Sequence, residues 1–233
     1  MLKSSSDALV TNRKLQLRIN TKMKRTGWEL EEKSYWERRA YYLSPKPHFD
    51  HRILEREKCV FRFLRDKIRG KRLLEVGCGT SYSVRDCLNP LQYSYFYVGT
   101  DIALEPLRTA KKFIQDGDFV QCAASEMPFK ASVFDVVLCL GVIHHLPGGE
   151  ENVLLLSNFV GKDGYFIAAE PMAKKSPLQH SLSRAFETKF EKQSPHENRL
   201  DKERFMKNVQ KIGELVAFHK NCSPVMTSPL FNG

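Results

Sequence analysis

The feature that most constrains the fold of this chain is the segment 73–81, whose sequence is LLEVGCGTS. An apolar run leads into two glycines, Gly77 and Gly79, and an acidic residue, Asp101, follows about 20 positions later. Glycine permits a tight turn after a buried strand and a close approach of the backbone to a ligand. A carboxylate at the end of the next strand can accept hydrogen bonds from both hydroxyls of a ribose. The segment therefore predicts a Rossmann-like βαβ unit that holds an adenosine-containing cofactor.

Two residues near this turn separate the possible cofactors. The dinucleotide fingerprint has a third glycine three positions after Gly79, where this chain has Tyr82. Glu75 places a carboxylate just before the turn. That carboxylate would repel a pyrophosphate, but it can accept a hydrogen bond, directly or through water, from the ammonium group of an amino acid. S-adenosylmethionine (SAM) carries such a group and no phosphate, so the pattern favours SAM over a nicotinamide dinucleotide.

Four segments, taken in order, resemble the motifs of class I SAM-dependent methyltransferases of the type 11 group. They are the glycine segment 75–80, the strand end 98–102, the segment 119–129 that wraps the adenine, and the fourth strand with its following loop, 134–147. The resemblance covers roughly residues 50–170 and implies that the chain binds SAM and transfers its methyl group. The cofactor-binding residues that it implies are Glu75, Gly77, Cys78, Gly79, Thr80, Asp101, Ile102, Ala124, Ser125 and Leu140.

The chain departs from the family pattern at two positions. The family often has a third glycine where Ser81 stands, and often an acidic residue that contacts the adenine amino group where Ala123 stands. The serine is a mild change, because its side chain can cap the helix that begins there. The alanine removes a hydrogen-bond acceptor. Ser125, Glu126 or backbone groups near Ala124 would then have to supply one.

Strands and helices are expected to alternate after residue 72. The expected strands are 72–76, 93–101, 119–122, 134–140 and 165–169, and the expected helices follow residue 80 and span 104–115 and 150–160, the last closed by Gly161 and Gly164. This alternation predicts an α/β, Rossmann-like, doubly wound and mostly parallel sheet with helices on both faces. Ligands of such sheets bind beyond the carboxyl ends of the strands, where Gly79, Asp101, Ala124, Leu140 and Glu170 all map.

The two ends of the chain are expected to add to this sheet. Residues 1–27 show little periodicity and predict a loose arm. Helices are expected at 28–42 and 50–68, the first with an apolar side made of Leu30, Tyr35, Trp36, Ala40 and Tyr41. We divide the chain into a basic N-terminal arm and helical lid, 1–48, and a SAM-binding methyltransferase domain, 49–233.

The segment after the fifth strand gives a weaker pattern. A helix is expected at 201–214 and a strand at 215–219. The family usually closes its sheet with an antiparallel seventh strand, for which only 225–231 remains. The pattern therefore leaves open whether the sheet is complete.

Composition limits the classes of protein to consider. The chain has 233 residues, 42 % of them hydrophobic, which suits one core. No apolar run approaches the ~18 residues of a membrane-spanning helix, and the N-terminus lacks the apolar core of a signal peptide. The six cysteines show no paired spacing, so buried free thiols are favoured over disulfides or a metal site, with Cys78, Cys122 and Cys139 on inner strands. We expect a cytoplasmic protein without a metal.

Positive charge is concentrated in the N-terminal third. Residues 1–72 hold 20 Lys and Arg against 9 Asp and Glu, whereas the whole chain has a net charge of +10. This segment can attract RNA, an anionic membrane surface or a phosphorylated substrate. A solvated helical surface explains the same charges.

Catalysis places few demands on the protein, because the sulfonium of SAM is already an electrophile. The site must align the acceptor and, for a hydroxyl, remove its proton. His144 and His145 follow the fourth strand, and either can act as the base. Glu170 can bind the acceptor or act as a base. Structural roles are the alternative for all three: a histidine packed beneath the loop, and a carboxylate that caps it. The aromatic residues near the N-terminus can cover the pocket or pack as helix core; they are Tyr35, Trp36, Tyr41 and Tyr42.

Several functions fit these observations. Segments 170–171, 177–178 and 194–197 resemble family members from glycan and lipid pathways, which implies methyl transfer to a small-molecule or glycan/lipid acceptor. RNA methylation is the second possibility, guided by the basic N-terminal region. A non-catalytic SAM-binding module is the third, since Ala123 departs from the family pattern. A nicotinamide-dependent dehydrogenase comes last.

Overall fold

The computed structural model describes residues 18–19, 27–39, 60–88, 94–172, 194–198, 200–219 and 222–227. Its strands are β1 (Arg18–Ile19), β2 (Arg72–Val76), β3 (Phe96–Asp101), β4 (Asp118–Gln121), β5 (Phe134–Leu140), β6 (Val160–Ala169), β7 (Leu215–His219) and β8 (Cys222–Thr227). Its α-helices are α1 (Gly27–Arg39), α3 (Tyr82–Cys87), α4 (Leu104–Phe113), α5 (Asn152–Ser157) and α7 (Lys202–Ile212). Residues 60–64 are also helical.

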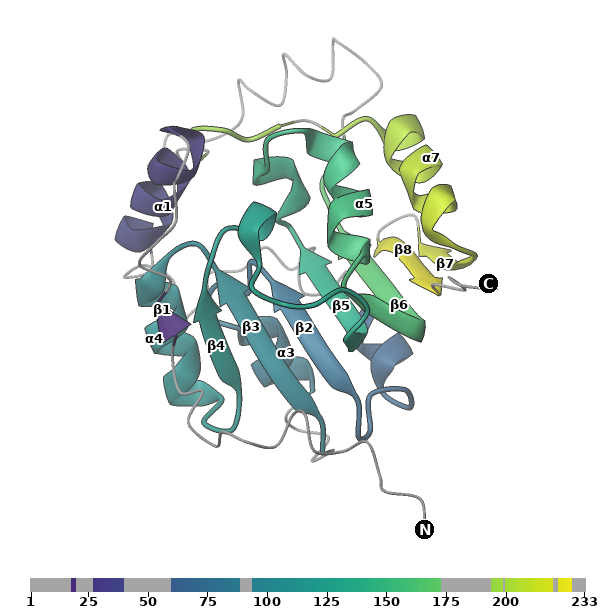
Figure 1. Cartoon of the computed structure of the whole chain (residues 1–233), viewed down its shortest axis with the longest axis horizontal. Coiled ribbons are helices and arrows are strands. Elements are labelled where there is room, and N and C mark those ends of the chain that lie inside the picture. The colour runs from purple at the N-terminus through teal and green to yellow at the C-terminus, as the bar shows by residue number, and fades with distance from the viewer. Residues whose placement is uncertain are drawn as a thin grey trace.

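The strands form one sheet in the order β1-β4-β3-β2-β5-β6-β8-β7 (Figure 1). Neighbouring strands from β1 to β6 pair in parallel, and β8 pairs antiparallel with both β6 and β7. From β2 the chain proceeds outward to β3 and β4, and then returns to place β5 on the other side of β2. The strand order therefore reverses between β2 and β5, and in open α/β sheets ligands bind beyond the carboxyl ends of the strands at such a point.

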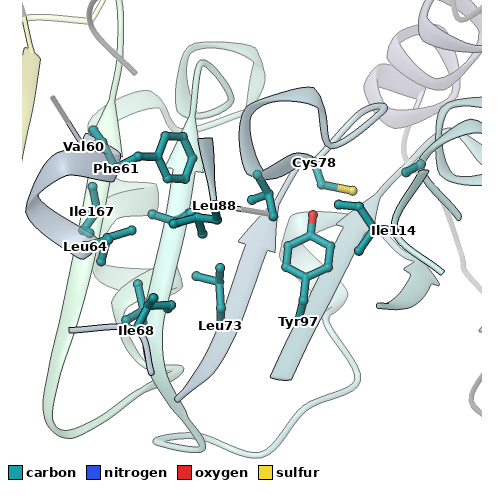
Figure 2. Close-up of a cluster of buried hydrophobic side chains, with 14 of the residues drawn as sticks. Val60, Phe61, Leu64, Ile68, Leu73, Cys78, Leu88, Tyr97, Ile114 and Ile167 are labelled. Atoms are coloured by element: carbon teal, nitrogen blue, oxygen red, sulfur yellow. The ribbon is translucent and has the colours of Figure 1, made fainter. Parts of the chain in front are cut away.

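Both faces of the sheet are covered by helices. Leu73 of β2 belongs to a cluster with segment 60–68, α3 and α4, whereas the next residue, Leu74, packs with α5 and α7 on the other face. Val136 and Val137 of β5 divide in the same way, because successive side chains of a strand point to opposite faces. Figure 2 shows the first cluster. The two apolar layers fix the sheet and, with it, the loops at its carboxyl edge.

Helix α1 lies at the carboxyl edge of the sheet, in contact with α4 (Figure 1). The sequence predicts an apolar side for this helix, and that prediction is wrong in its detail. The buried residues of α1 are Glu29 and Glu32, whereas Leu30 is 50 % exposed. The two carboxylates are buried because donors from the loops meet them, as described below. Of the predicted apolar side, Ala40 and Tyr41 lie outside the described residues.

The structure confirms the predicted fold class: a Rossmann-like, mostly parallel sheet with helices on both faces. One prediction around β6 is wrong. Gly161 and Gly164 do not close a helix but lie inside β6, which begins at Val160. A Cβ atom on Gly164 would come within 2.7 Å of the carbonyl oxygen of Asp135, so these glycines allow close strand approach.

The ends of the chain extend the sheet further than the sequence predicts. β8 begins at Cys222 rather than 225 and pairs antiparallel with β6, so the strand order closes as β6-β8-β7. In the region predicted as a loose arm, β1 pairs with β4. The predicted helix 50–68 is described only from residue 60, and the division at 48 stays a prediction. Across the described residues, no helix is both long and apolar enough to cross a membrane.

Candidate functional site

The glycine turn after β2 has two glycines with different neighbours. Both have positive φ, +62° at Gly77 and +53° at Gly79, a conformation that side chains disfavour. A Cβ atom on Gly77 would lie 2.4 Å from Cγ2 of Val142, so this glycine packs against the loop after β5. A Cβ atom on Gly79 would meet nothing within 4 Å. Gly79 therefore presents bare backbone to open space at the edge where a ligand is expected.

Asp101, at the end of β3, connects the two loops beside it. Its Oδ2 accepts a hydrogen bond of 2.9 Å from the backbone amide of Gly79, and its Oδ1 accepts one of 2.8 Å from the amide of Ala103. Burial raises the pKa of Asp101 to about 6. Each carboxylate oxygen has two lone pairs, so one amide on each leaves capacity for the two hydroxyls of a ribose.

Glu75 is buried on the face of the sheet that carries α3 and α4. Its carboxylate accepts a hydrogen bond from the hydroxyl of Tyr97, and that hydroxyl lies 2.7 Å from Oγ of Ser81. The Tyr97 hydroxyl has one proton, which it uses in the hydrogen bond donated to Glu75. In the contact between Ser81 and Tyr97, Ser81 is therefore the donor. Figure 2 shows the Tyr97 hydroxyl at the Cys78 end of the ring. Burial, followed by the charge of Glu75, raises the pKa of Tyr97 well above its usual value.

The predicted helix cap at Ser81 is wrong. Ser81 has φ 52° and stands at the N-terminus of α3, but its side chain makes no capping hydrogen bond. Its hydroxyl is engaged with Tyr97 instead. The chain thus keeps the left-handed backbone that the family's third glycine provides, and a buried hydrogen bond offsets part of its cost.

The loop after β4 contains the alanine that replaces the family's adenine acceptor. The amide of Cys122 donates a hydrogen bond to the carbonyl of Asp101, which keeps this loop beside the end of β3. Ser125, in the 3₁₀ turn Ala124–Glu126, donates a 2.8 Å hydrogen bond to Oε1 of Glu29 on α1. A carboxylate from the N-terminal helix therefore reaches the segment that lacks one at Ala123. The sequence gives no signal of this, because 96 positions separate the partners.

Glu170, just after β6, organises the loop after β5. Its Oε1 accepts the backbone amides of Val142 and Ile143 at 2.9 and 3.0 Å. Its Oε2 lies 2.7 Å from Nδ1 of His144, and the Glu170 side chain is fully buried. Of the three roles considered for Glu170, namely acceptor binding, general base and loop cap, these contacts match the cap of the neighbouring loop. Leu140 stands half-buried at the end of β5, where this loop begins.

His145 lies in a separate group of polar side chains. Its Nδ1 is 2.8 Å from Oγ of Ser194, which donates a 2.8 Å hydrogen bond to Oε1 of Glu32. Burial, with a smaller contribution from His144, lowers the pKa of His145 to about 3. The imidazole is therefore neutral at physiological pH. Ser194 and Glu32 are 162 positions apart. In the sequence, Ser194 was named only within segment 194–197, and Glu32 was not named.

Comparison with known proteins identifies the family of the central segment. Residues 74–168, from β2 to β6, match the family described as a methyltransferase domain. The matched segment contains the glycine turn, Asp101 and the loop after β5. This part of the chain is a class I SAM-dependent methyltransferase domain. No curated protein matches the chain.

Solved structures resemble this chain in fold. A protein from Bacillus halodurans C-125 described as a methyltransferase is 21 % identical, with 70 % of this chain and 71 % of that chain covered and a TM-score of 0.57. The YcgJ protein of Bacillus subtilis is 20 % identical over 70 % and 68 %, with a TM-score of 0.55. Geranyl diphosphate C-methyltransferase from Streptomyces coelicolor A3(2) is 12 % identical over 80 % and 79 %, with a TM-score of 0.56.

Helix α1 lies outside the matched methyltransferase segment but contacts it at several loops. Glu37 accepts the backbone amides of Leu104 and Glu105, at 2.8 and 2.9 Å, at the start of α4. The indole of Trp28 donates to the carbonyl of His145 at 2.9 Å. With the contacts of Glu29 and Glu32, this helix joins the loops that follow β3, β4 and β5. Among the predicted lid aromatics, Tyr35 and Trp36 are on α1, and Tyr41 and Tyr42 lie outside the described residues.

Among the residues that the structure describes, the cysteines and acidic side chains form no further centre. Cys78, Cys122 and Cys139 are free and buried, as predicted. In the part of the chain that the structure describes, no group of three or more His, Cys, Asp or Glu residues has the arrangement of a metal site.

Proposed function

We propose that this protein binds SAM at the carboxyl ends of β2, β3, β4 and β5 and transfers its methyl group to a small-molecule or glycan/lipid-pathway acceptor. One observation carries the proposal. The Cα of Gly79 faces open space, and the amide of Gly79 donates a hydrogen bond to Asp101. Exposed backbone and a carboxylate able to bind a diol therefore lie together at the point where the strand order reverses.

The residues at this edge fit SAM better than a dinucleotide. Glu75, Asp101 and Glu29 all belong to or contact the loops around the turn, and such a set of carboxylates disfavours a pyrophosphate. Asp101 would hold the ribose, and the backbone at Gly79 would approach the methionine part. Bound SAM supplies an electrophilic methyl group. Geranyl diphosphate C-methyltransferase, which has a similar fold, was solved in complex with S-adenosyl-L-homocysteine, the demethylated form of SAM. This complex supports SAM as the cofactor.

Other cofactor-binding positions follow from the same placement. The proposal assigns to the adenosine and methionine parts the loop residues at the ends of four strands, namely Cys78, Thr80, Ile102, Ala124, Ser125 and Leu140. Ala124 and Ser125 lie in the 3₁₀ turn after β4, and Leu140 is the last residue of β5. The side chain of Cys78 is buried in the core, so its contribution to binding would come from its backbone.

Calorimetry with SAM and with NAD tests the cofactor. We expect SAM to bind and NAD to give no heat of binding. Gly79→Leu should abolish SAM binding by filling the open space. Gly70→Leu is the matched control, because Gly70 also has positive φ, +68°, and open space around its Cα but precedes β2 at the opposite edge. Equal SAM affinity in Gly79→Leu and wild type would refute the site.

RNA is the second candidate acceptor, favoured by the excess of 20 basic over 9 acidic residues in segment 1–72. If phosphates are contacted, RNA affinity should fall steeply and linearly on a log–log plot against salt. Incubation with labelled SAM and fractionated cell extract would then identify the acceptor class from the labelled product. SAM binding without any labelled product in any fraction would favour a non-catalytic SAM-binding module.

A further inference from the structure

The Glu32 carboxylate on α1 is buried and surrounded by donors. Its Oε1 accepts hydrogen bonds from Oγ of Ser194, at 2.8 Å, and from the backbone amide of His196, at 3.1 Å. Its Oε2 accepts the indole N–H of Trp36 at 2.8 Å. The carboxylate is the acceptor in all three hydrogen bonds, and an ionised carboxylate can only accept.

This arrangement fixes the proton on the His145 ring. The Ser194 hydroxyl has a single proton and uses it in the hydrogen bond that it donates to Glu32. Its oxygen can therefore only accept a hydrogen bond from His145. The 2.8 Å contact between Ser194 Oγ and His145 Nδ1 then requires a proton on Nδ1. Because a neutral imidazole carries only one N–H, Nε2 of His145 is left with a free lone pair.

The His145 ring is also held in place from other sides. The Trp36 ring meets it edge-on, with ring centroids 5.4 Å apart, and the His144 ring lies at 3.9 Å. Trp28 holds the backbone carbonyl of His145. The side chain keeps 15 % of its surface exposed, and Nε2 makes no hydrogen bond to any residue the structure describes. The ring therefore presents one oriented basic nitrogen just past the end of β5.

We propose that Glu32 and Ser194 are positioning residues that make Nε2 of His145 the general base for a hydroxyl acceptor. The inference rests on the proposed methyl transfer and narrows its substrate to a group that must lose a proton. An ionised or carbanionic acceptor would need no such base.

The proton transfer balances within the three side chains. The O–H bond of the acceptor breaks, and its proton passes to Nε2 of His145. The electron pair of that bond forms the new O–CH₃ bond. The sulfur of the methyl donor keeps the electron pair of the S–CH₃ bond that breaks. The Nδ1 proton moves to Ser194 Oγ, and the Ser194 proton moves to Glu32 Oε1. The positive charge of the donor and the negative charge of Glu32 are both removed. Loss of the Nε2 proton to water, with return of the Glu32 proton to Ser194 and of the Ser194 proton to Nδ1, restores the starting state.

The relay explains how a buried histidine acts at neutral pH. Since burial lowers the pKa of His145 to about 3, an imidazolium would be costly at this position. In the relay the imidazole gains a proton at Nε2 and loses one from Nδ1, so the ring stays neutral. The only one of the three side chains whose charge changes is Glu32, which becomes protonated. Because Glu32 belongs to α1, the base is complete only when this helix is docked on the loops.

The tautomer of His145 tests the relay without SAM or an acceptor. We would record ¹⁵N–¹H spectra of the full chain with ¹⁵N-labelled histidine, and assign His145 among the seven histidines by its loss in His145→Gln. The relay predicts a proton on Nδ1 and none on Nε2, the reverse of the form that free histidine favours in water. A proton on Nε2 in the wild type would overturn the proposal whatever the variants do.

Two variants and a control extend the test. Ser194→Ala and Glu32→Gln should each shift His145 toward the Nε2–H form, and retention of the Nδ1–H form in Ser194→Ala would contradict the relay. Glu31→Gln is the matched control, because Glu31 is next to Glu32 on α1 but bonds Nε2 of His196, at 2.7 Å. Failure of SAM to bind would refute the proposed function and leave the tautomer result unchanged, so the two failures are distinguishable.

Discussion

The hydroxyl of Tyr97 on β3 donates a hydrogen bond to the buried carboxylate of Glu75 on the neighbouring strand β2. Tyr97 stands opposite Leu73 in the register of these parallel strands, so its ring extends along the sheet to reach Glu75 two residues further on. Ser81 completes the chain by donating to Tyr97. Side chains of β3 and of the start of α3 thus fix the position of Glu75, the carboxylate that precedes the glycine turn.

Removal of the Tyr97 hydroxyl should destabilise the fold. Tyr97→Phe would leave the buried Glu75 carboxylate without this donor and Ser81 without its acceptor, at a cost of roughly 1–3 kcal/mol in the free energy of unfolding. Urea denaturation measures the change. Tyr165→Phe is the control, because Tyr165 packs edge-on against Phe63 and its hydroxyl bonds no described residue. Equal losses in both variants would contradict a specific role for the Tyr97 hydroxyl.

SAM affinity should depend on the ionisation of Asp101. With its pKa raised to about 6, the carboxyl is protonated at lower pH and offers the ribose fewer acceptors. We expect the association constant to fall below pH 6, approaching about tenfold per pH unit. Calorimetry from pH 7.5 to 5 measures this. Asp101→Asn should bind more weakly, and its affinity should not change with pH over this range; a wild-type profile equally flat would exclude Asp101 as the titrating ligand.

Fold stability should respond to pH through His145. Its folded pKa, about 3, lies below the ordinary histidine value of 6.5, so between these limits the unfolded chain binds the proton more readily. The stability from this group is therefore complete above pH 6.5 and is lost as pH falls toward 3, with a slope of at most ~1.4 kcal/mol per pH unit. Urea denaturation of wild type and His145→Gln at several pH values gives the difference. Parallel curves would show that His145 does not contribute.

Glu37 should hold α1 to the start of α4. Glu37→Ala removes a carboxylate that accepts two backbone amides at a helix N-terminus, which is worth roughly 1–3 kcal/mol. Amide hydrogen exchange should become faster in α1 and stay unchanged in β2. The neighbouring substitution Arg38→Ala, on the exposed side of α1, serves as the control. Unchanged protection of α1 in Glu37→Ala would show that other contacts suffice to dock it.

The sequence predicted the sheet well because strong local patterns define it. The apolar runs at β2 and β5 are bounded by glycine turns or charged residues, and their bounds were predicted as observed. Gly161 and Gly164 misled the assignment of β6, because a glycine that ends a helix and one that allows close strand approach look alike in sequence. The distinction depends on the Asp135 carbonyl across the sheet.

The cofactor edge was predictable and the rest of the site was not. The glycine turn and Asp101 have a fixed spacing within one βαβ unit. By contrast, the Glu29–Ser125 and Glu32–Ser194 contacts join segments 96 and 162 positions apart. Periodicity also treats every glutamate as a solvated residue, so it assigned the buried side of α1 to apolar residues. Only the three-dimensional placement of the donors shows which carboxylates are buried.

The way α1 is attached has a thermodynamic consequence. Its buried residues are two glutamates, and its hydrogen bonds to the loops are made largely by carboxylates. Release of such a helix would hydrate much polar surface, which lowers heat capacity, whereas exposure of apolar surface raises it. Undocking of α1 should therefore show a much smaller heat-capacity change per residue than unfolding of the sheet, and calorimetry would register the two as separate events.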